Sequence, residues 1–163
     1  MRVANIICTG YSLKGFDLNS IEGYKIAVNY AHRYLDHYDA LVAWDNVEMP
    51  LEKLHTLKEY GKDCTGYIPG IVGEFDRNEG YTTNFASSLF FAINIALQKG
   101  FDHVKIYGCD MQLTDGMVHF YDDKPPQDNI KEIYRKRFIQ DRKYLDRVLS
   151  SLKENEKIEF ITV

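Results

Sequence analysis

One stretch in the middle of the chain constrains the fold most strongly, because it reads as a helix, a tight turn and a buried strand. Thr82 or Thr83 can cap the start of the helix, since a hydroxyl there accepts a hydrogen bond from a free backbone N–H. The helix body, 85–98, places apolar residues at the i, i+3, i+4 spacing of one face. Gly100 suits the left-handed conformation that ends many helices, and 104–107 is a short β-branched and aromatic run. This succession is typical of a parallel α/β unit.

The rest of the chain supplies further elements of the same kind. Short apolar runs predict strands, and longer runs with one apolar face predict helices. We expect strands at 3–8, 24–28, 40–44, 64–68 and 157–163, and helices at 50–59 and 130–152. The pattern predicts an α/β fold: a single Rossmann-like domain over residues 1–163, with a mostly parallel central sheet flanked by helices.

Length and composition bound the class of protein. A chain of 163 residues fits one domain with a core large enough for stability. The formal net charge of −4 argues against a protein dedicated to coating nucleic acid. The apolar runs are far too short to span a bilayer, and Met1 and Arg2 lead directly into a strand, so we expect no membrane span and a cytoplasmic location. Cys8, Cys64 and Cys109 have no metal-type spacing and are expected as reduced thiols.

Polar residues follow the expected strands at their carboxyl ends, where parallel sheets bind ligands. After the first strand, Gly10 can let the backbone approach a ligand, and Ser12 can help to hold a phosphate or carboxylate. The other strand exits carry the polar residues Asn29, Asp45, Asn46 and Asp110. Each of these can also be an ordinary turn residue. Their recurrence at successive strand exits nevertheless predicts one shared pocket.

The long loop at 111–129 follows the central strand, and loops of this length usually serve a function or are disordered. It contains His119. Because an imidazole titrates near neutral pH, His119 is a candidate general base or acid for a hydroxyl proton, the alternative being a surface histidine. We expect residues 69–80 to form a loop ahead of the central helix, of the kind that can serve as a lid. The basic residues of helix 130–152 alternate with acidic ones, which is typical of a solvated helix face.

Motifs of several common classes are missing from the sequence. There is no G-x-x-x-x-G-K-[ST] loop and no G-x-G-x-x-G after the first strand, so ordinary NTPase and NAD-binding assignments lose support. Histidine and cysteine do not occur at zinc spacing. The Asp-x-Asp signature with which metal-dependent sugar transferases hold a nucleotide-sugar is also missing. We therefore expect neither a metal nor a resident cofactor.

Several short stretches together resemble the family 42 sialyltransferases and a related bacterial and phage Rossmann-like domain of unknown function. In that group the first strand runs into Gly-x-Gly-Pro-Ser-Leu, and residues 8–13 (CTGYSL) stand in its place. Later strands end in Asn and in a polar pair, matched by Asn29 and by 45–46. A Thr-Ser-Gly that opens a helix is matched by 87–89, and the Ile-Tyr-Leu-x-Gly-x-Asp strand after it is matched by 104–110.

The resemblance implies a Rossmann-like fold and a metal-independent nucleotide-sugar donor. It would line the nucleotide pocket with Ser12, Asn29, Asp45, Asn46, Ser88 and Asp110. It makes His119 the nearest candidate for the catalytic base. The chain departs from the family pattern at Cys8, Tyr11 and Leu89, where the family has glycine, proline and glycine.

Two nucleotide-binding functions and one without a nucleotide are compatible with these residues. In the first, the protein is a glycosyltransferase-like enzyme that binds a nucleotide or nucleotide-sugar, with His119 as base and Ser12 at the leaving phosphate. In the second, it is a non-catalytic nucleotide binder, for example a phage-encoded sponge that sequesters a nucleotide signal in the host cytoplasm. A third, an interaction domain on this fold, predicts that no nucleotide binds. A homo-oligomer also fits, because a shared pocket would compensate for the acceptor lid that this short chain lacks.

Overall fold

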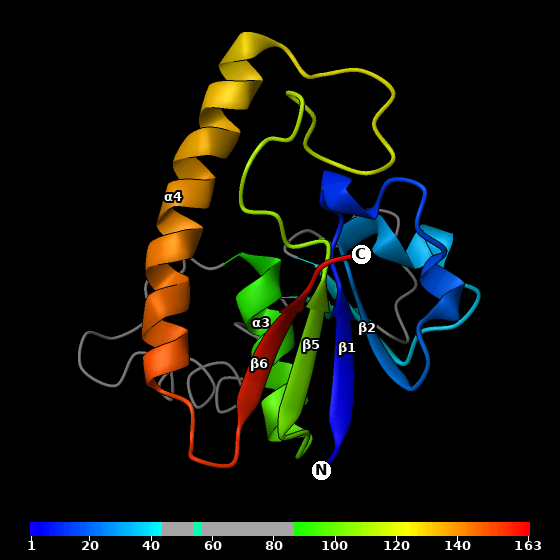
Figure 1. Ribbon diagram of the computed structural model, residues 1–163, viewed down its shortest axis with the longest axis vertical. Coiled ribbons are helices and arrows are strands. Elements are labelled where there is room, and N and C mark those ends of the chain that lie inside the picture. Colours follow the sequence, from blue (N-terminus) through cyan, green and yellow to red (C-terminus); the bar gives the residue numbers. More distant parts are fainter. Residues whose placement is uncertain (44–53, 57–86) are drawn as a thin grey trace.

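The structure is a computed structural model that describes residues 1–43, 54–56 and 87–163 (Figure 1). Labels with η mark 3-10 helices. In chain order the elements are β1 (Val3–Ile7), η1 (Tyr11–Leu13), η2 (Leu18–Ser20), β2 (Tyr24–Val28), η3 (Asn29–Tyr34), β3 (Ala40–Ala43), β4 (Leu54–Thr56), α3 (Ser88–Gln98), β5 (His103–Tyr107), α4 (Asp128–Ser150) and β6 (Lys157–Ile161).

The strands form one sheet in the order β4-β3-β2-β1-β5-β6, six strands within the described part of the chain. Every pairing in it is parallel. β1 is central, and its Ile6 lies in register with Ile26 of β2 and Ile106 of β5. These three side chains are buried, as expected of parallel strands that are covered on both faces. The predicted α/β Rossmann-like fold with a parallel central sheet is confirmed.

The two faces of the sheet are covered differently. α3 lies against one face, and α4 packs beside it through Tyr144, whose ring centroid is 4.7 Å from that of Phe90. The start of α4 stands beyond the carboxyl ends of the strands (Figure 1). The opposite face is covered by the 3-10 helices and part of the loop after β5, which contribute the buried residues Leu13, Leu18, Ala31, Leu35 and Phe120. In the described residues, α-helices therefore flank one face and 3-10 helices the other.

Most expected elements are confirmed to within two residues. The strands predicted at 3–8, 24–28, 40–44 and 157–163 form as β1, β2, β3 and β6, each within two residues of its predicted ends. The helix predicted at 130–152 forms as α4, with both ends two residues earlier. α3 begins at Ser88 after the N-cap Ser87, and the turn after it uses Gly100 at φ +80°, as its sequence position predicts. The Thr82 or Thr83 cap, the strand at 64–68 and the segment 69–80 lie outside the described residues.

The helix predicted at 50–59 is wrong over residues 54–56. These residues form β4, which pairs in parallel with residues 41–43 of β3 at the edge of the sheet. Hydrogen bonding to an open strand edge outweighs the helical signal that Pro50 gave, because local propensity is weaker than tertiary pairing.

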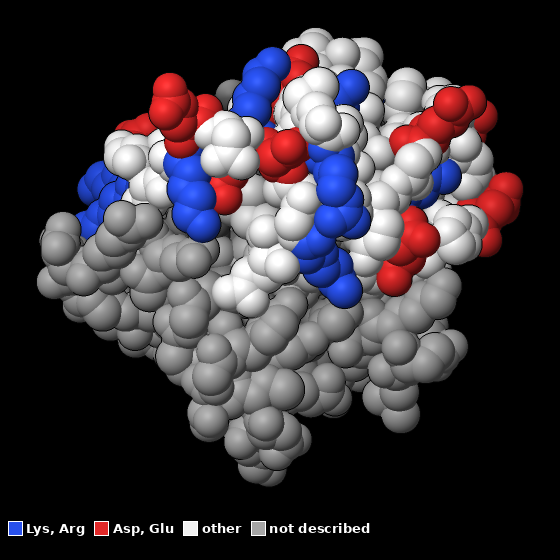
Figure 2. Space-filling model, turned by 90° about the horizontal axis from the view of Figure 1, so that it is seen from below, with Lys and Arg blue, Asp and Glu red and all other residues white. Residues whose placement is uncertain are grey.

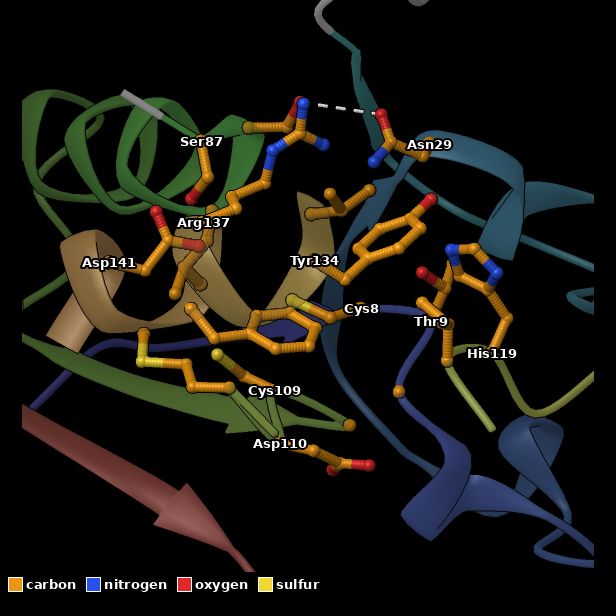
Figure 3. Close-up of a pocket in the computed structure, with 18 of the residues that line it drawn as sticks. Cys8, Thr9, Asn29, Ser87, Cys109, Asp110, His119, Tyr134, Arg137 and Asp141 are labelled. Carbon is orange, nitrogen blue, oxygen red and sulfur yellow. Dashed lines mark hydrogen bonds between the residues drawn. The ribbon is translucent and has the colours of Figure 1, made fainter. Parts of the chain in front are cut away.

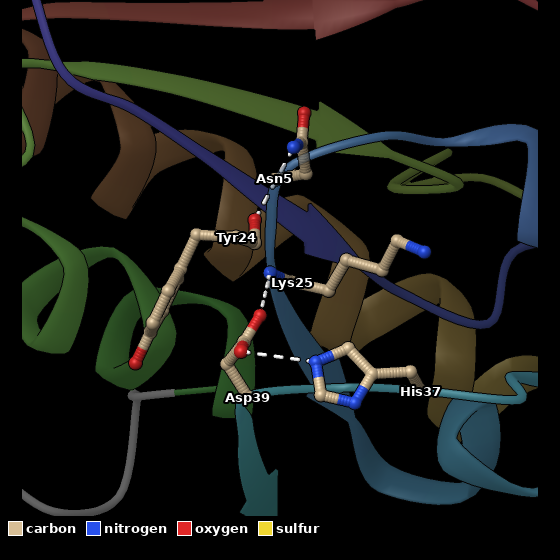
Figure 4. A network of polar contacts seen from close by, with 5 residues as sticks. All are labelled: Asn5, Tyr24, Lys25, His37 and Asp39. Atoms are coloured by element: carbon tan, nitrogen blue, oxygen red, sulfur yellow. Dashed lines mark hydrogen bonds and ion pairs between the residues drawn. The ribbon is translucent and has the colours of Figure 1, made fainter.

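A polar network fixes the register near the amino-terminal ends of the strands, away from the carboxyl ends where the pocket lies (Figure 4). Asn5 Nδ2 donates to the Tyr24 carbonyl at 3.2 Å. The Lys25 amide donates to Asp39 Oδ2 at 2.8 Å, and His37 Nε2 lies 3.1 Å from Asp39 Oδ1. The polar residues within these otherwise apolar strands thus serve the alignment of β1, β2 and β3.

Charged side chains of both signs are interspersed over the described surface seen in Figure 2. On α4, Lys131 Nζ lies 3.7 Å from Asp128 Oδ1, and Arg135 Nη1 lies 3.8 Å from Glu132 Oε2. The helix therefore presents the mixed solvated face that its sequence predicts. Within the described residues, no helix has both the length and the apolar character needed to cross a membrane.

Candidate functional site

A pocket of about 190 Å³ lies at the carboxyl ends of β1, β2 and β5 (Figure 3). The chain leaves β1 for β2 on one side and later returns to β5 on the other, so the loops after β1 and β5 diverge from a switch point, where Rossmann-like sheets bind ligands. The start of α3, the loop after β5 and α4 complete the walls. The lining includes Cys8, Thr9, Gly10, Asn29, Ser87, Ser88, Leu89, Cys109, Asp110, Val118, His119, Tyr134, Arg137, Phe138 and Asp141.

Three of the predicted site residues join the loops after β1 and β5. The Gly10 amide donates to the Gly108 carbonyl at 2.7 Å, and a Cβ on Gly10 would clash with that oxygen. The Ser12 amide donates to Asp110 Oδ2 at 2.9 Å, and the Ser12 hydroxyl donates to Asp110 Oδ1. Gly10 and Asp110 line the pocket, whereas Ser12 is outside its lining. The glycine at position 10 is thus required by the contact between loops, and the Ser12 hydroxyl and the Asp110 carboxylate are engaged with each other.

Two other predicted residues meet at the start of α3. The Ser88 hydroxyl donates to Asn29 Oδ1 at 3.3 Å. Asn29 has a φ of 52°, the left-handed conformation that asparagine tolerates better than most residues. Ser87 precedes α3 as an N-cap without a side-chain capping bond. The first backbone N–H groups of a helix carry a partial positive charge, so this wall favours an anion.

His119 lines the same pocket, on the side across from Ser87 (Figure 3). Its Nδ1 lies 3.2 Å from Asp122 Oδ2, and its ring stacks on Tyr121 with centroids 5.0 Å apart and planes at 5°. A carboxylate only accepts hydrogen bonds, so the ring proton belongs on Nδ1 and the lone pair on Nε2. No hydrogen bond from a described residue engages Nε2. Burial lowers the pKa of His119, an effect that Asp122 partly opposes, so the ring is neutral at neutral pH.

The loop that carries His119 is anchored by main-chain contacts. The Phe120 amide donates to the Thr9 carbonyl at 3.0 Å, and Gly10 and His119 form an isolated antiparallel bridge. The guanidinium of Arg142 on α4 donates to the Met111 carbonyl near the start of the same loop. A neutral imidazole held by a carboxylate on an anchored loop can act as a general base.

α4 contributes residues that the sequence patterns did not single out. Tyr134, Arg137, Phe138 and Asp141 fall on one side of the helix and face the pocket. The guanidinium carbon of Arg137 lies 5.8 Å from the centroid of the Tyr134 ring. Asp141 is only 7% exposed, and burial raises its pKa to about 6 although Arg137 opposes the shift. The signal was present in the sequence: a carboxylate on the predicted apolar face of a helix.

Two cysteines lie on the inner wall of the pocket. Cys8 and Cys109 are free thiols, as predicted, and Cys64 is outside the described residues. A hydrogen bond with Cys109 and burial raise the pKa of Cys8 well above its usual value. The Cys8 thiol is therefore protonated at neutral pH and contributes polarisable, uncharged surface.

The predicted ligands Asp45 and Asn46 lie outside the described residues. Gly10, Asn29, Ser88, Asp110 and His119 all line one pocket, which is the arrangement that the strand exits predicted. In the described part of the chain, no group of three or more His, Cys, Asp or Glu side chains is arranged to hold a metal ion.

Comparison with protein-family models gives no match, and comparison with curated proteins gives none either. Among solved structures, the chain is similar to the crystal structure of a probable thiamine pyrophosphokinase from Staphylococcus saprophyticus subsp. saprophyticus, with 12% sequence identity and a TM-score of 0.42. The likeness covers 98% of this chain and 65% of that chain. A likeness this distant carries no inference about fold or ligand, so the assignment of the site rests on the chain's own residues.

Proposed function

We propose that the protein binds a nucleotide or nucleotide-sugar in the pocket at the strand exits and transfers the sugar without a metal ion. One observation carries the proposal: the Asn29–Ser88 pair at the start of α3 and the oriented His119 line the same pocket. The start of α3 suits binding of an anion, and His119 suits removal of a proton. Metal-independent glycosyl transfer needs both. The resemblance to family 42 sialyltransferases makes a cytidine nucleotide-sugar the first ligand to test.

His119 and the start of α3 have different roles in the proposed transfer. His119 Nε2 takes the proton of an acceptor hydroxyl, and the acceptor oxygen then forms a bond to the anomeric carbon. The bond from that carbon to the phosphate oxygen breaks, and its electron pair leaves with the phosphate. The amides at the start of α3 and the Arg137 guanidinium stabilise the charge on the leaving phosphate. Ser12 receives no part in this step, because its hydroxyl donates to Asp110.

The size of the pocket supports a second candidate, a nucleotide binder without turnover. At about 190 Å³ the pocket is below the range of roughly 300–1,000 Å³ that is usual for small-molecule sites. It accommodates part of a nucleotide-sugar and leaves little room for an acceptor beside it. A sponge that sequesters a nucleotide signal would need only the binding half of the site.

The first experiment is thermal unfolding with nucleotides, nucleotide-sugars and cyclic nucleotides, each with EDTA and with Mg²⁺. A ligand at about one hundred times its Kd stabilises the native state by about 2.7 kcal/mol, which is readily measured. We expect a nucleotide-sugar to stabilise the protein equally under both conditions. Stabilisation by cyclic nucleotides alone, with the ligand recovered intact, would favour the sponge. No stabilisation by any compound would leave the interaction domain as the remaining reading.

The second experiment separates binding from transfer. We expect His119→Ala to lower turnover by about 100-fold or more, the usual contribution of a general base, while nucleotide affinity stays nearly constant. The matched control is His37→Ala, since His37 pairs with Asp39 at the far edge of the sheet. The wild-type rate should rise with pH through an apparent pKa below 6.5, because burial lowers the pKa of His119. Equal loss of binding and turnover in His119→Ala would contradict its role as base.

A further inference from the structure

Asp141 is a buried carboxylate to which the proposed transfer assigns no part. It lies on the inward side of α4 and lines the pocket, on the same wall as Ser87 and across from His119 (Figure 3). Asp141 is only 7% exposed to solvent. No described residue donates a hydrogen bond to its carboxylate or forms an ion pair with it. Arg137, one turn earlier on α4, attracts it electrostatically but is itself exposed.

A carboxylate in this position lacks the partners that buried charges normally have. Burying an ionised carboxylate without a hydrogen-bond donor is strongly unfavourable, so buried carboxylates are almost always paired. The lining around Asp141 includes the Cys8 and Cys109 thiols and the Phe138 ring, which are weak donors or none. The Ser87 hydroxyl lies on the same wall but makes no hydrogen bond to Asp141. No described residue therefore satisfies Asp141, and a molecule bound in the pocket can supply the missing donors.

The surrounding charges narrow the chemistry of that donor. A phosphate is repelled by a carboxylate, so the phosphate belongs at the start of α3 and near Arg137. A cationic amine would be repelled by Arg137 and by the partial positive charge of the α3 N-terminus. A neutral hydroxyl meets neither objection and donates well to a carboxylate. The mixed lining of thiols and Phe138 also suits a sugar, which presents both hydroxyl groups and C–H surface.

We propose that Asp141 is a specificity-determining residue that accepts hydrogen bonds from the hydroxyl groups of a sugar inserted into the inner end of the pocket. The assignment rests on the proposed function, since it concerns the sugar half of the same ligand. It predicts that the pocket discriminates a nucleotide-sugar from the free nucleotide, and that it rejects a sugar lacking the recognised hydroxyl. The phosphate contacts would be shared by both compounds.

The test compares three pairs of ligands by calorimetry: CMP-N-acetylneuraminic acid with CMP, UDP-glucose with UDP, and GDP-mannose with GDP. For the pair that binds the wild type, we expect Asp141→Asn to weaken the nucleotide-sugar by about 10- to 100-fold, as loss of hydrogen bonds to a charged group does. Affinity for the free nucleotide should stay within about twofold. The matched control is Asp146→Asn, which changes an exposed carboxylate on the same helix.

A measurement on the wild type provides an independent check. Hydroxyl donors favour the charged carboxylate, so binding of the nucleotide-sugar at about pH 6 should release a proton, measured from binding enthalpies in two buffers. Among the described residues, the titratable groups that line the pocket with Asp141 are Arg137 and Tyr134 on α4, Cys8 at the end of β1, and Cys109 and Asp110 after β5, with His119 across the pocket. If proton release on binding persists in His119→Ala and disappears in Asp141→Asn, the released proton comes from Asp141.

The outcomes separate this assignment from the proposed function. If the wild type binds a nucleotide-sugar and Asp141→Asn binds it equally well, the assignment is overturned and the proposed function stands. Equal weakening of nucleotide-sugar and free nucleotide would also overturn it, since Asp141 would then support the pocket as a whole. If none of the six compounds binds the wild type, the proposed function fails and the assignment falls with it.

Discussion

A carboxylate enclosed between α4 and the ends of β1 and β5 makes stability depend on pH. Burial raises the pKa of Asp141 to about 6 in the folded protein, whereas an unfolded aspartate titrates at about 3.9. The folded state therefore binds this proton more tightly than the unfolded state does. The stability linked to the proton is fully present below the unfolded pKa and is lost as pH rises through the folded pKa.

Asp141→Asn should therefore be more stable than the wild type at neutral pH and nearly equal to it in acid. From the two pKa values, we expect the difference in unfolding free energy to grow by about 2 kcal/mol between about pH 4 and pH 7. Urea unfolding of both proteins across this range measures it. A difference that does not change with pH would mean that the carboxylate has a partner in the folded state.

Some site residues could be predicted from the sequence and others could not, for a physical reason. Asn29 and His119 were found because strand exits and long loops face a common edge of a parallel sheet, whatever the packing angles. A carboxylate on the apolar face of α4 marks Asp141 in the sequence, but neither it nor Arg137 could be assigned to the site, because which turn of α4 meets the pocket depends on how the helix crosses the sheet. Asp110 was predicted from its position at the end of β5. Its hydrogen bond with Ser12 was not, because it joins two loops that are far apart in the sequence.

At the scale of elements, the loops after β1 and β5 behave as one unit. Gly10 has an ordinary φ of −63° but no room for a Cβ, because Gly108 and Asp110 fill the space. Gly15 has a φ of +78° and open space around it. Gly10 is therefore required because a side chain would not fit, whereas Gly15 is favoured because of its backbone conformation.

Alanine at each position should have a different effect. We expect Gly10→Ala to cost about 2–3 kcal/mol and to weaken ligand binding, because the loop after β5 must move away. Gly15→Ala should cost about 1 kcal/mol, the strain of a left-handed alanine, and leave binding unchanged. Unfolding in urea and the thermal shift with ligand measure both effects. Gly10→Ala with wild-type stability and binding would show that the loops can separate at no cost.

Elements were predictable from sequence where a strong periodic pattern and the final environment agree. β1, β2, β5 and α4 fall where the apolar patterns place them. β4 does not, because a three-residue strand has too few residues for a pattern and exists through its pairing with β3. The covering of the second sheet face by 3-10 helices was also not foreseen, since such short turns have no periodicity of their own.

On the scale of the whole molecule, the centre of the sheet should be the last part to open. β1 is paired on both sides, by β2 and β5, whereas β6 is paired only by β5 among the described strands. Interior strands with buried side chains on both neighbours exchange their amides only through large openings. The edge strand can separate from the sheet with less loss of contacts.

Hydrogen exchange followed by mass spectrometry tests this order. We expect residues 3–7, 24–28 and 103–107 to exchange most slowly, and residues 157–161 to exchange earlier. A bound nucleotide-sugar should add protection at 8–13, 87–90 and 108–112, the segments that form and support the pocket. If β6 is protected for longer than β1, the pairing order of the sheet does not govern its opening.

The frame of the pocket is built largely from peptide groups. Cys8, Gly10 and Phe120 donate their amides to the carbonyls of Tyr107, Gly108 and Thr9, at 2.9, 2.7 and 3.0 Å. Every residue except proline can supply such a bond. Provided that glycine stays at position 10, a lineage that keeps this frame can therefore replace most of the other side chains on it without moving the pocket. Relatives of this protein would then share its backbone fold even where their sequences no longer align.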